Sequence, residues 1–312
     1  MISSWVSGIY PRSESLIEAT RTYDKDLKQL FKKEKIRSIK HQINNKCDYI
    51  SDPLIDWDDN LRPFTDNIKG IERGALSRYY ENNTFYRQPV IIGNISSSGK
   101  ILKNNINFEL FSKKSKVKID VLDPFTLADL SKNNHYKSKI DLANGFGKIL
   151  RKELTNIKNK VDLIQFNAPS LAKIKQKEQI QSIKQIMDKT TKGLNVKTCL
   201  NLCGSDISNN IKNFIDFNVD IIGIDFINTK SNKLQAIEID KTLACGIIDA
   251  KNTKMENPTK VINEIKLINK LFKPKSIAII PNWDFEFIPL EFTYKKIRIM
   301  NQIKMKGKGI NL

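Results

Sequence analysis

The sequence has few of the residues that mark exported, membrane-spanning or metal-rich proteins. It contains four cysteines at irregular spacing and two histidines in 312 residues. The opening segment MISSWVSGIY has neither a basic stretch nor a long apolar stretch, so it does not resemble a secretory signal. No apolar run approaches the roughly 18 to 20 residues that a membrane-spanning helix requires. We therefore expect a cytoplasmic protein with reduced thiols and no membrane segment.

Acidic residues are also few compared with basic ones. The sequence has 34 Asp and Glu against 53 Lys and Arg, which gives a formal net charge of +19. A clustered basic surface would indicate nucleic-acid binding, since Lys and Arg release counterions from phosphates. Here the lysines are spread along nearly every segment, and no groove-reading motif is present. We interpret the charge as a generally basic solvated surface and expect no nucleic-acid partner.

What the sequence does contain is a series of short apolar, β-branched runs. Eight of them recur, each ending in a polar, Gly or Pro residue, at 47–51, 90–93, 117–122, 161–166, 196–202, 219–226, 243–248 and 276–280. Such continuous runs are typical of parallel strands buried on both faces. Between most of them lie segments of helical period, such as 171–187 and 261–272. The alternation predicts a (β/α)8 TIM barrel of class α/β, with a doubly wound open sheet as the alternative.

The length suits one domain, because such a barrel takes roughly 250 residues and tolerates insertions. We expect a single barrel over residues 1–312, with the amino-terminal segment 1–45 packed on it. The first connection, 52–89, is too long for a plain βα loop and is expected to lie over the mouth of the barrel. Loops of that size at the catalytic face are usually functional.

Side chains that end the strands of a barrel converge on one mouth. The residues in such positions are Asp52, Asp123, Asn167, Asn201, Cys203, Asp206, Asp225, Asp249, Asn282 and Trp283. Cys203 and Asp225 are the best candidates for metal ligands, because zinc favours Cys, His and carboxylate groups. Two ligands are too few for a zinc site, and Cys199, deeper in its strand, has plain packing as its alternative role. His41 and His135 lie outside the strand ends and are expected at the surface.

Arginines and aromatic residues interleave near the start of the chain and in the long connection. Arg12 precedes a helix that Ser13 is expected to cap, and it is a candidate anion contact. The long connection contains Trp57, Arg62, Phe64, Arg73, Arg78, Tyr79, Tyr80, Phe85, Tyr86 and Arg87. This mixture suits a flat, anionic ligand, through stacking and bidentate pairing. The alternative is a loop that packs its own aromatic residues over the barrel.

Several stretches are recognisable together, in order from Gly8 to Pro289. They are GIYPRSESLIEATRTYD, WDDNLRPF, GALSRYYENNTFYRQPVIIG, DPFTLADLS, IQFNAPSLA, CGIIDAKNT and PNWDFEFIP. This series resembles the stand-alone archaeal-type relatives of cobalamin-independent methionine synthase. The resemblance implies a (β/α)8 barrel that transfers a methyl group from methyl-tetrahydrofolate, or another methyl carrier, to homocysteine in methionine biosynthesis. In that family a His-x-Cys pair, a Glu and a second Cys hold zinc, which turns the homocysteine thiol into a thiolate.

The resemblance also shows where this chain departs from the family. The His-x-Cys position reads Asn201-Leu202-Cys203, the Glu position reads Asp225, and the second Cys position reads Trp283. The substrate-binding Asp-Glu-Pro appears as Asn167-Ala168-Pro169. In two-barrel members the amino-terminal barrel has lost its zinc ligands, and CGIIDAKNT resembles that barrel better than the catalytic one.

Three functions are compatible with the resemblance. The first is a homocysteine methyltransferase in which Cys203 and Asp225 hold zinc. The alternative is a zinc-less, non-catalytic barrel that binds folate or serves as partner subunit of a separately encoded catalytic barrel. A related barrel with a different thiol or decarboxylation substrate is a third option. The substrate-binding residues expected from these comparisons of motifs are Arg12, Arg62, Arg87, Asn167 and Asp249. The sequence identifies no catalytic residue, methyl donor or oligomeric state.

Overall fold

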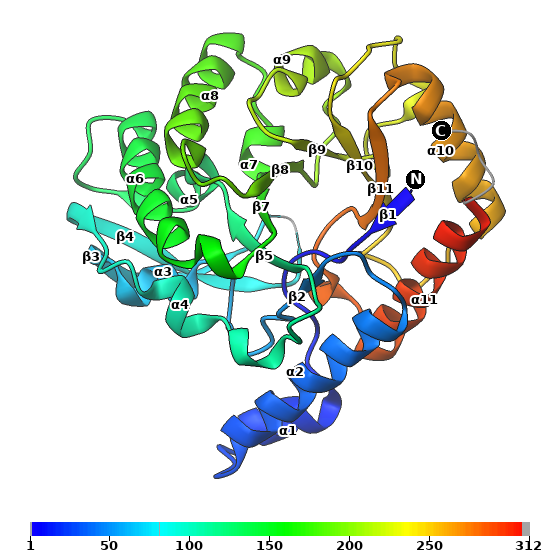
Figure 1. Ribbon diagram of the computed structural model, residues 1–312. Coiled ribbons are helices and arrows are strands. Elements are labelled where there is room, and N and C mark those ends of the chain that lie inside the picture. Colours follow the sequence, from blue (N-terminus) through cyan, green and yellow to red (C-terminus); the bar gives the residue numbers. More distant parts are fainter. Residues whose placement is uncertain (1, 81, 308–312) are drawn as a thin grey trace.

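The computed structural model describes residues 2–80 and 82–307 and has the expected α/β barrel (Figure 1). Within that part of the chain, the main sheet has eight strands that all pair in parallel, in the order β1-β11-β10-β9-β8-β7-β5-β2. They are β1 (Ile2–Ser4), β2 (Ile50–Ser51), β5 (Val117–Leu122), β7 (Leu163–Asn167), β8 (Lys197–Leu202), β9 (Ile221–Asp225), β10 (Thr242–Ile248) and β11 (Ser276–Pro281). Nearly every residue of these strands is buried, as parallel strands covered by helices must be.

The ring closes where β1 meets the segment just before β2. The backbone N–H of Asp48 donates to the Ser4 carbonyl oxygen at 2.8 Å. In return, the Asp48 carboxylate accepts from the Ser4 N–H at 2.7 Å. One residue therefore supplies the hydrogen bonds between the first and second barrel strands, which keeps both edges of the sheet paired.

Helices surround the barrel (Figure 1). The long ones are α2 (Leu27–Asn44), α6 (Lys139–Ile157), α8 (Lys177–Thr191), α10 (Pro258–Phe272) and α11 (Leu290–Gly307). The short ones are α1 (Glu14–Arg21), α3 (Arg62–Asn67), α4 (Ile101–Asn105), α5 (Pro124–Asp129), α7 (Pro169–Ala172) and α9 (Ile211–Ile215), with 3-10 turns at η1 (Phe108–Leu110), η2 (Lys158–Lys160), η3 (Ser208–Asn210), η4 (Ser231–Lys233) and η5 (Phe285–Phe287). Among the described residues, no helix is both long and apolar enough to cross a membrane.

Three elements differ from what the sequence led us to expect. The run 90–93 is not a barrel strand but part of β4 (Phe85–Ser96), which pairs antiparallel with β3 (Lys69–Arg78) and parallel with β6 (Lys132–Asn133). The eighth barrel strand is β1, whose sequence ISS is too short and too polar to form an apolar run. The helix expected over 171–187 is divided into α7 and α8.

The β3–β4 hairpin runs along one side of the barrel and its tip reaches the mouth (Figure 1). Near the tip, the Tyr80 hydroxyl lies 2.6 Å from the Ser170 hydroxyl on α7. Tyr86 on β4 donates its hydroxyl to the Leu130 carbonyl oxygen at 2.9 Å. These contacts bring the aromatic residues of the long connection over the ends of the barrel strands.

Candidate functional site

Asp225, the last residue of β9, accepts hydrogen bonds on both carboxylate oxygens. Its Oδ1 accepts from the backbone N–H groups of Ile227 at 2.9 Å and Asn228 at 3.0 Å. Its Oδ2 accepts from the Gly204 N–H at 3.0 Å and the Asn228 side chain at 2.6 Å. The Asn282 amide lies 3.4 Å from both oxygens. Asp225 therefore joins the turn after β9 to the loop after β8, and protein donors occupy its lone pairs.

Cys203 follows β8 and lies beside this carboxylate, with its thiol buried. Burial, together with the carboxylates of Asp284 and Asp225, raises the pKa of the Cys203 thiol well above its usual value. The ligand that zinc prefers is the thiolate. In the absence of a cation, the surroundings of Cys203 therefore favour the protonated thiol.

The remaining positions offer no better donors. The Asn201 side-chain amide donates to Asn167 Oδ1 at 3.0 Å, and the Trp283 side chain has no lone pair for a metal. Across residues 2–80 and 82–307, no group of three or more His, Cys, Asp or Glu is placed to hold a metal ion. With Asp225 committed to protein donors, the residues at the mouth do not fit a zinc ion.

Instead of a metal site, the mouth carries four aromatic side chains, Tyr79, Tyr80, Trp283 and Phe287, which we call the aromatic cover. The Trp283 ring centroid lies 6.3 Å from that of Tyr79 and 5.7 Å from that of Tyr80. The Trp283 ring centroid also lies 6.3 Å from that of Phe287. The Lys251 ammonium lies 4.2 Å from the Trp283 ring centroid, at cation–π distance. Contacts between the hairpin tip and the segment after β11 thus cover the strand ends.

Gly204 allows Trp283 to lie in this place. Its φ is +79°, a left-handed conformation that favours glycine. A Cβ atom on Gly204 would lie 1.6 Å from Trp283 Cζ3. The Trp283 ring therefore occupies the space that any side chain at position 204 would need.

Three of the expected substrate-binding residues are brought together around Asp58 and Asp59. Arg12 Nη2 lies 3.3 Å from Asp58 Oδ1, and Arg62 Nη1 lies 3.9 Å from Asp58 Oδ2. Arg62 Nε lies 3.6 Å from Asp59 Oδ2, which also accepts the Arg87 backbone N–H at 3.2 Å. The Arg12 and Arg62 side chains remain 22% and 19% exposed, so a ligand can reach them. We call Arg12, Arg62 and Arg87 the arginine group; Arg87 joins it through its backbone N–H, while its Nη1 donates to the Gly74 carbonyl oxygen at 3.5 Å.

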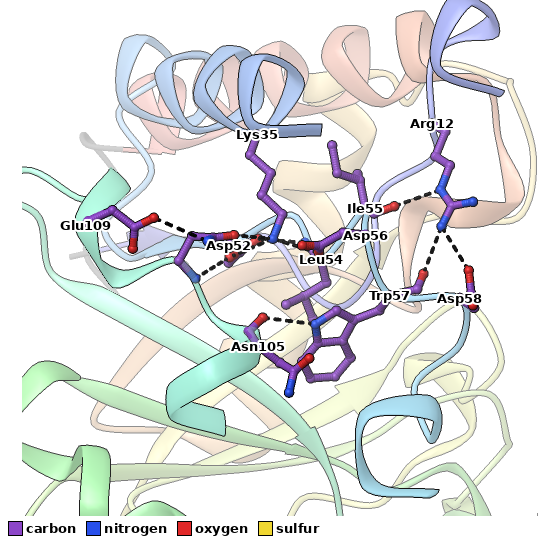
Figure 2. A network of polar contacts seen from close by, with 11 residues as sticks. Arg12, Lys35, Asp52, Leu54, Ile55, Asp56, Trp57, Asp58, Asn105 and Glu109 are labelled. Atoms are coloured by element: carbon purple, nitrogen blue, oxygen red, sulfur yellow. Dashed lines mark hydrogen bonds and ion pairs between the residues drawn. The ribbon is translucent and has the colours of Figure 1, made fainter. Parts of the chain in front are cut away.

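Segment 52–58, which leads into this group, is held from both ends (Figure 2). Toward its carboxyl end, Arg12 Nε donates to the Ile55 carbonyl oxygen at 2.7 Å and Arg12 Nη2 to the Trp57 carbonyl oxygen at 3.4 Å. Arg12 itself is positioned by the start of α1, where Ser13 Oγ accepts from the Leu16 N–H and caps the helix, as expected. Between the two ends, Leu54 has a φ of +52°, a strained conformation for a residue with a side chain.

At the other end, the ammonium of Lys35 on α2 is buried among three polar partners (Figure 2). It lies 3.1 Å from Asp52 Oδ1, 2.7 Å from Asp56 Oδ1 and 2.6 Å from Asn107 Oδ1. Asp52 also accepts the backbone N–H groups of Leu54 at 3.0 Å and Asn107 at 2.9 Å. Burial raises the pKa of Asp52, and the Lys35 charge acts in the opposite direction.

The other two expected substrate-binding residues lie elsewhere and are engaged in local hydrogen bonds. Asn167 is buried, and its Oδ1 accepts from Gln165 Nε2 at 2.8 Å as well as from Asn201. Asp249 shapes the turn after β10, where its Oδ1 accepts the Lys251 N–H at 2.9 Å. Their role as substrate contacts stays a prediction.

A small cavity of about 210 Å³ lies beside the arginine group. Asp59 and Glu286 line it together with Tyr79. Burial, with the nearby carboxylates of Asp284 and Asp59, raises the pKa of Glu286 to about 8. These surroundings favour the protonated form of Glu286.

Sequence reasoning missed the acidic residues of this region. Asp58 and Asp59 were quoted only as part of WDDNLRPF, and Asp284 and Glu286 only as part of PNWDFEFIP. Adjacent carboxylates in a segment rich in arginine were the available signal, since buried arginines are usually paired. Which arginine meets which carboxylate depends on folding, because Asp58 contacts Arg12 from a distant part of the chain.

Known proteins resemble this chain over most of its length. A family model described as "Cobalamin-independent synthase, N-terminal domain" matches residues 69–273. The methionine synthase of Sulfurisphaera tokodaii is 25% identical over 333 residues, covering 100% of this chain and 96% of that protein. That of Saccharolobus solfataricus is 25% identical over 330 residues, covering 100% and 98%.

Solved structures show the same fold. A B12-independent methionine synthase from Shewanella sp. W3-18-1, solved with selenomethionine, superposes with a TM-score of 0.72 at 17% identity, covering 91% of this chain and 89% of that one. A putative vitamin-B12 independent methionine synthase from Listeria monocytogenes gives a TM-score of 0.70 at 13% identity, covering 99% and 100%. The barrel expected from the sequence is thereby confirmed.

Proposed function

The chain belongs to the cobalamin-independent methionine synthase family, whose reaction is methyl transfer to homocysteine in methionine biosynthesis, and we propose that it contributes the methyl-donor-binding barrel to that reaction. In this proposal the zinc that activates homocysteine is held by a separately encoded catalytic barrel. The observation that carries the proposal is the mouth itself, where Asp225 is saturated by protein donors and Trp283 covers the strand ends. We also propose that the protein works in the cytoplasm.

The arginine group supplies the donor-binding chemistry. Methyl-tetrahydrofolate carries carboxylates on its glutamate tail, and planar guanidinium groups bind carboxylates through two parallel hydrogen bonds. Arg12 and Arg62 are each partly exposed, and the hairpin that carries Arg87 also carries aromatic side chains suited to stacking against a flat ring. The role of this chain's residues is to bind and orient the donor.

The first test is a mixing experiment with metal analysis. We expect the purified chain to contain well under one equivalent of zinc, to the same extent in wild type and Cys203→Ser. Alone it should not methylate homocysteine, whereas addition of the zinc-bearing barrel from the same organism should give methionine. Production of methionine by the metal-free chain alone, or stoichiometric zinc that Cys203→Ser removes, would overturn the proposed division of labour.

Arg62→Ala is expected to weaken the binding of methyl-tetrahydrofolate by about tenfold or more. The reason is that a charge-assisted hydrogen bond contributes roughly 1.5–3 kcal/mol, and about 1.4 kcal/mol is a tenfold change in affinity. The measurement is isothermal titration calorimetry at fixed ionic strength. Arg21→Ala is the matched control, because Arg21 is exposed on α1 and pairs only with Glu18 in the described structure. Equal affinities for the two variants would argue against a donor contact at Arg62.

A further inference from the structure

Tyr80 is a member of the aromatic cover that remains accessible to solvent. Tyr79 and Trp283 are buried, at 5% and 3% exposure, whereas Tyr80 is only partly buried. The Lys173 ammonium lies 4.4 Å from the Tyr80 ring centroid, and the Trp283 ring centroid lies 5.7 Å from it. Tyr80 also has a φ of +53°, a left-handed conformation that a residue with a side chain keeps only where its surroundings hold it. Its place therefore depends on a few specific contacts.

The Tyr80 hydroxyl is held by a chain of hydrogen bonds that leads to the surface. Ser170 Oγ donates its one hydroxyl proton to Asp129 Oδ2 at 2.6 Å. The Tyr80 hydroxyl, 2.6 Å from Ser170 Oγ, must therefore be the donor in the bond between these two groups. The Asp129 side chain is 31% exposed and is also paired with Lys139. We call Ser170 and Asp129 the latch.

Two buried groups, Asp123 and Cys203, lie close to the Tyr80 hydroxyl. Burial raises the pKa of Tyr80 well above its usual value, and the hydrogen bond to Ser170 acts in the opposite direction. The charged forms of Asp123 and Cys203 raise this pKa further, because both groups are near the hydroxyl. Asp123 and Cys203 are 0% and 4% exposed. The partly exposed Tyr80 thus separates them from solvent on this side of the mouth.

Asp123 has one carboxylate oxygen that the closed mouth leaves unsatisfied. Its Oδ1 accepts the backbone N–H groups of Phe125 at 2.9 Å and Thr126 at 3.2 Å, at the start of α5. Its Oδ2 is buried and has no hydrogen-bond partner among the described residues. Burial raises the pKa of Asp123 to about 7, against the opposing effect of the Thr126 and Phe125 donors. A buried acceptor without a partner costs free energy, so entry of a hydrogen-bond donor beside Asp123 would be favourable.

The other half of the aromatic cover is fixed more firmly. The Trp283 ring fills the space beside Gly204, and the preceding Asn282 accepts the Ala250 N–H on its Oδ1 at 2.9 Å. Movement of Trp283 would disrupt these buried contacts. Movement of Tyr80 breaks one hydrogen bond and a few ring contacts. The mouth therefore opens most readily on the Tyr80 side.

We propose that Tyr80 is a gate at the mouth of the barrel, kept closed by the latch, and that its opening lets small polar molecules reach Asp123 and Cys203. In the open state, Asp123 Oδ2 accepts a hydrogen bond from the entering molecule. The gate is separate from the donor-binding role, because no residue of the arginine group takes part in it.

The test measures how fast iodoacetamide alkylates Cys203 in the native protein at fixed pH, with the Cys203 peptide quantified by mass spectrometry. Tyr80→Phe and Ser170→Ala each remove the bond between gate and latch. Each should raise the rate about two- to tenfold, the change in an equilibrium that one neutral hydrogen bond controls. Tyr80→Ala removes the gate itself and should raise the rate by more than either. Unchanged rates in these variants would overturn the proposal.

Tyr86→Phe is the matched control, because it removes a tyrosine hydroxyl bond from the same hairpin, to the Leu130 carbonyl oxygen at 2.9 Å. Its Cys203 rate should stay at the wild-type value. Cys199 and Cys245 are each 0% exposed and serve as reporters of general unfolding, so their rates should not change in any variant. A parallel rise of all three cysteines would indicate loosening of the whole barrel and would contradict a gate at Tyr80.

Discussion

Lys35→Met should lower the free energy of unfolding by about 3–5 kcal/mol, the usual range for removal of one partner from a buried ion pair. The substitution leaves the buried Asp52 carboxylate without its cation, while Asp56 and Asn107 lose their donor. Segment 52–58 should loosen as a result, and the arginine group with it. The measurement is urea-induced unfolding followed by circular dichroism, with Lys33→Met as control on the exposed face of the same helix.

The effect should depend on pH in a defined direction. Without Lys35, the pKa of Asp52 rises further above its unfolded value, because burial already raises it and the opposing charge is gone. A carboxyl with a raised folded-state pKa favours the native state at low pH and loses that contribution as pH rises through the folded pKa. The loss in Lys35→Met should therefore be smaller near about pH 5 than near about pH 8. A loss of the same size at both pH values would show that packing, not the buried charge, accounts for it.

Trp283→Ala and Gly204→Ala should each destabilise strongly, yet less than additively when combined. Loss of the buried Trp283 ring is expected to cost about 3–5 kcal/mol, in the range for large-to-small core substitutions. Gly204→Ala forces a Cβ into that ring from a left-handed backbone, for about 2–4 kcal/mol from overpacking and strain together. With Trp283 removed, only the backbone strain remains. The coupling energy should be about 1–3 kcal/mol.

Gly193→Ala separates the two contributions to the Gly204 effect. Gly193 has a φ of +74°, but the nearest atom to a Cβ there is Arg151 Nη2 at 3.9 Å, so only the backbone strain applies. Its cost should be about 1–2 kcal/mol. Trp283→Ala should also expose Cys203 to thiol reagents, since the aromatic cover shields the strand ends. Additive losses in the double variant would mean that Trp283 and Gly204 do not share the mouth.

The predictions from sequence worked where burial is a local property. The runs that became β7, β8, β9, β10 and β11 are continuous apolar segments, and their pattern reports two buried faces directly. The predictions missed β1, because ISS is too short and too polar to be recognised as an apolar run. It is buried because it pairs with β11 inside the barrel. The run at 90–93 has strand composition but lies in a hairpin, where Ile92 remains 52% exposed. Composition alone cannot separate these cases.

The same distinction between local composition and contacts made on folding applies to the candidate site. The sequence by itself determined the barrel class, the family and the loss of zinc-ligand types at Asn201 and Trp283, because these depend only on residue identity and order. Only the tertiary structure decided that Asp225 is saturated by protein donors, that Trp283 lies against Gly204, and that Asp58 and Asp59 gather the arginine group. The physical reason is distance along the chain. The contacts of Asp225 with Gly204, of Trp283 with Gly204 and of Arg12 with Asp58 join separate loops, whereas Arg62 pairs with Asp58 and Asp59 within its own segment. Which loops meet depends on the closed ring of strands that carries them.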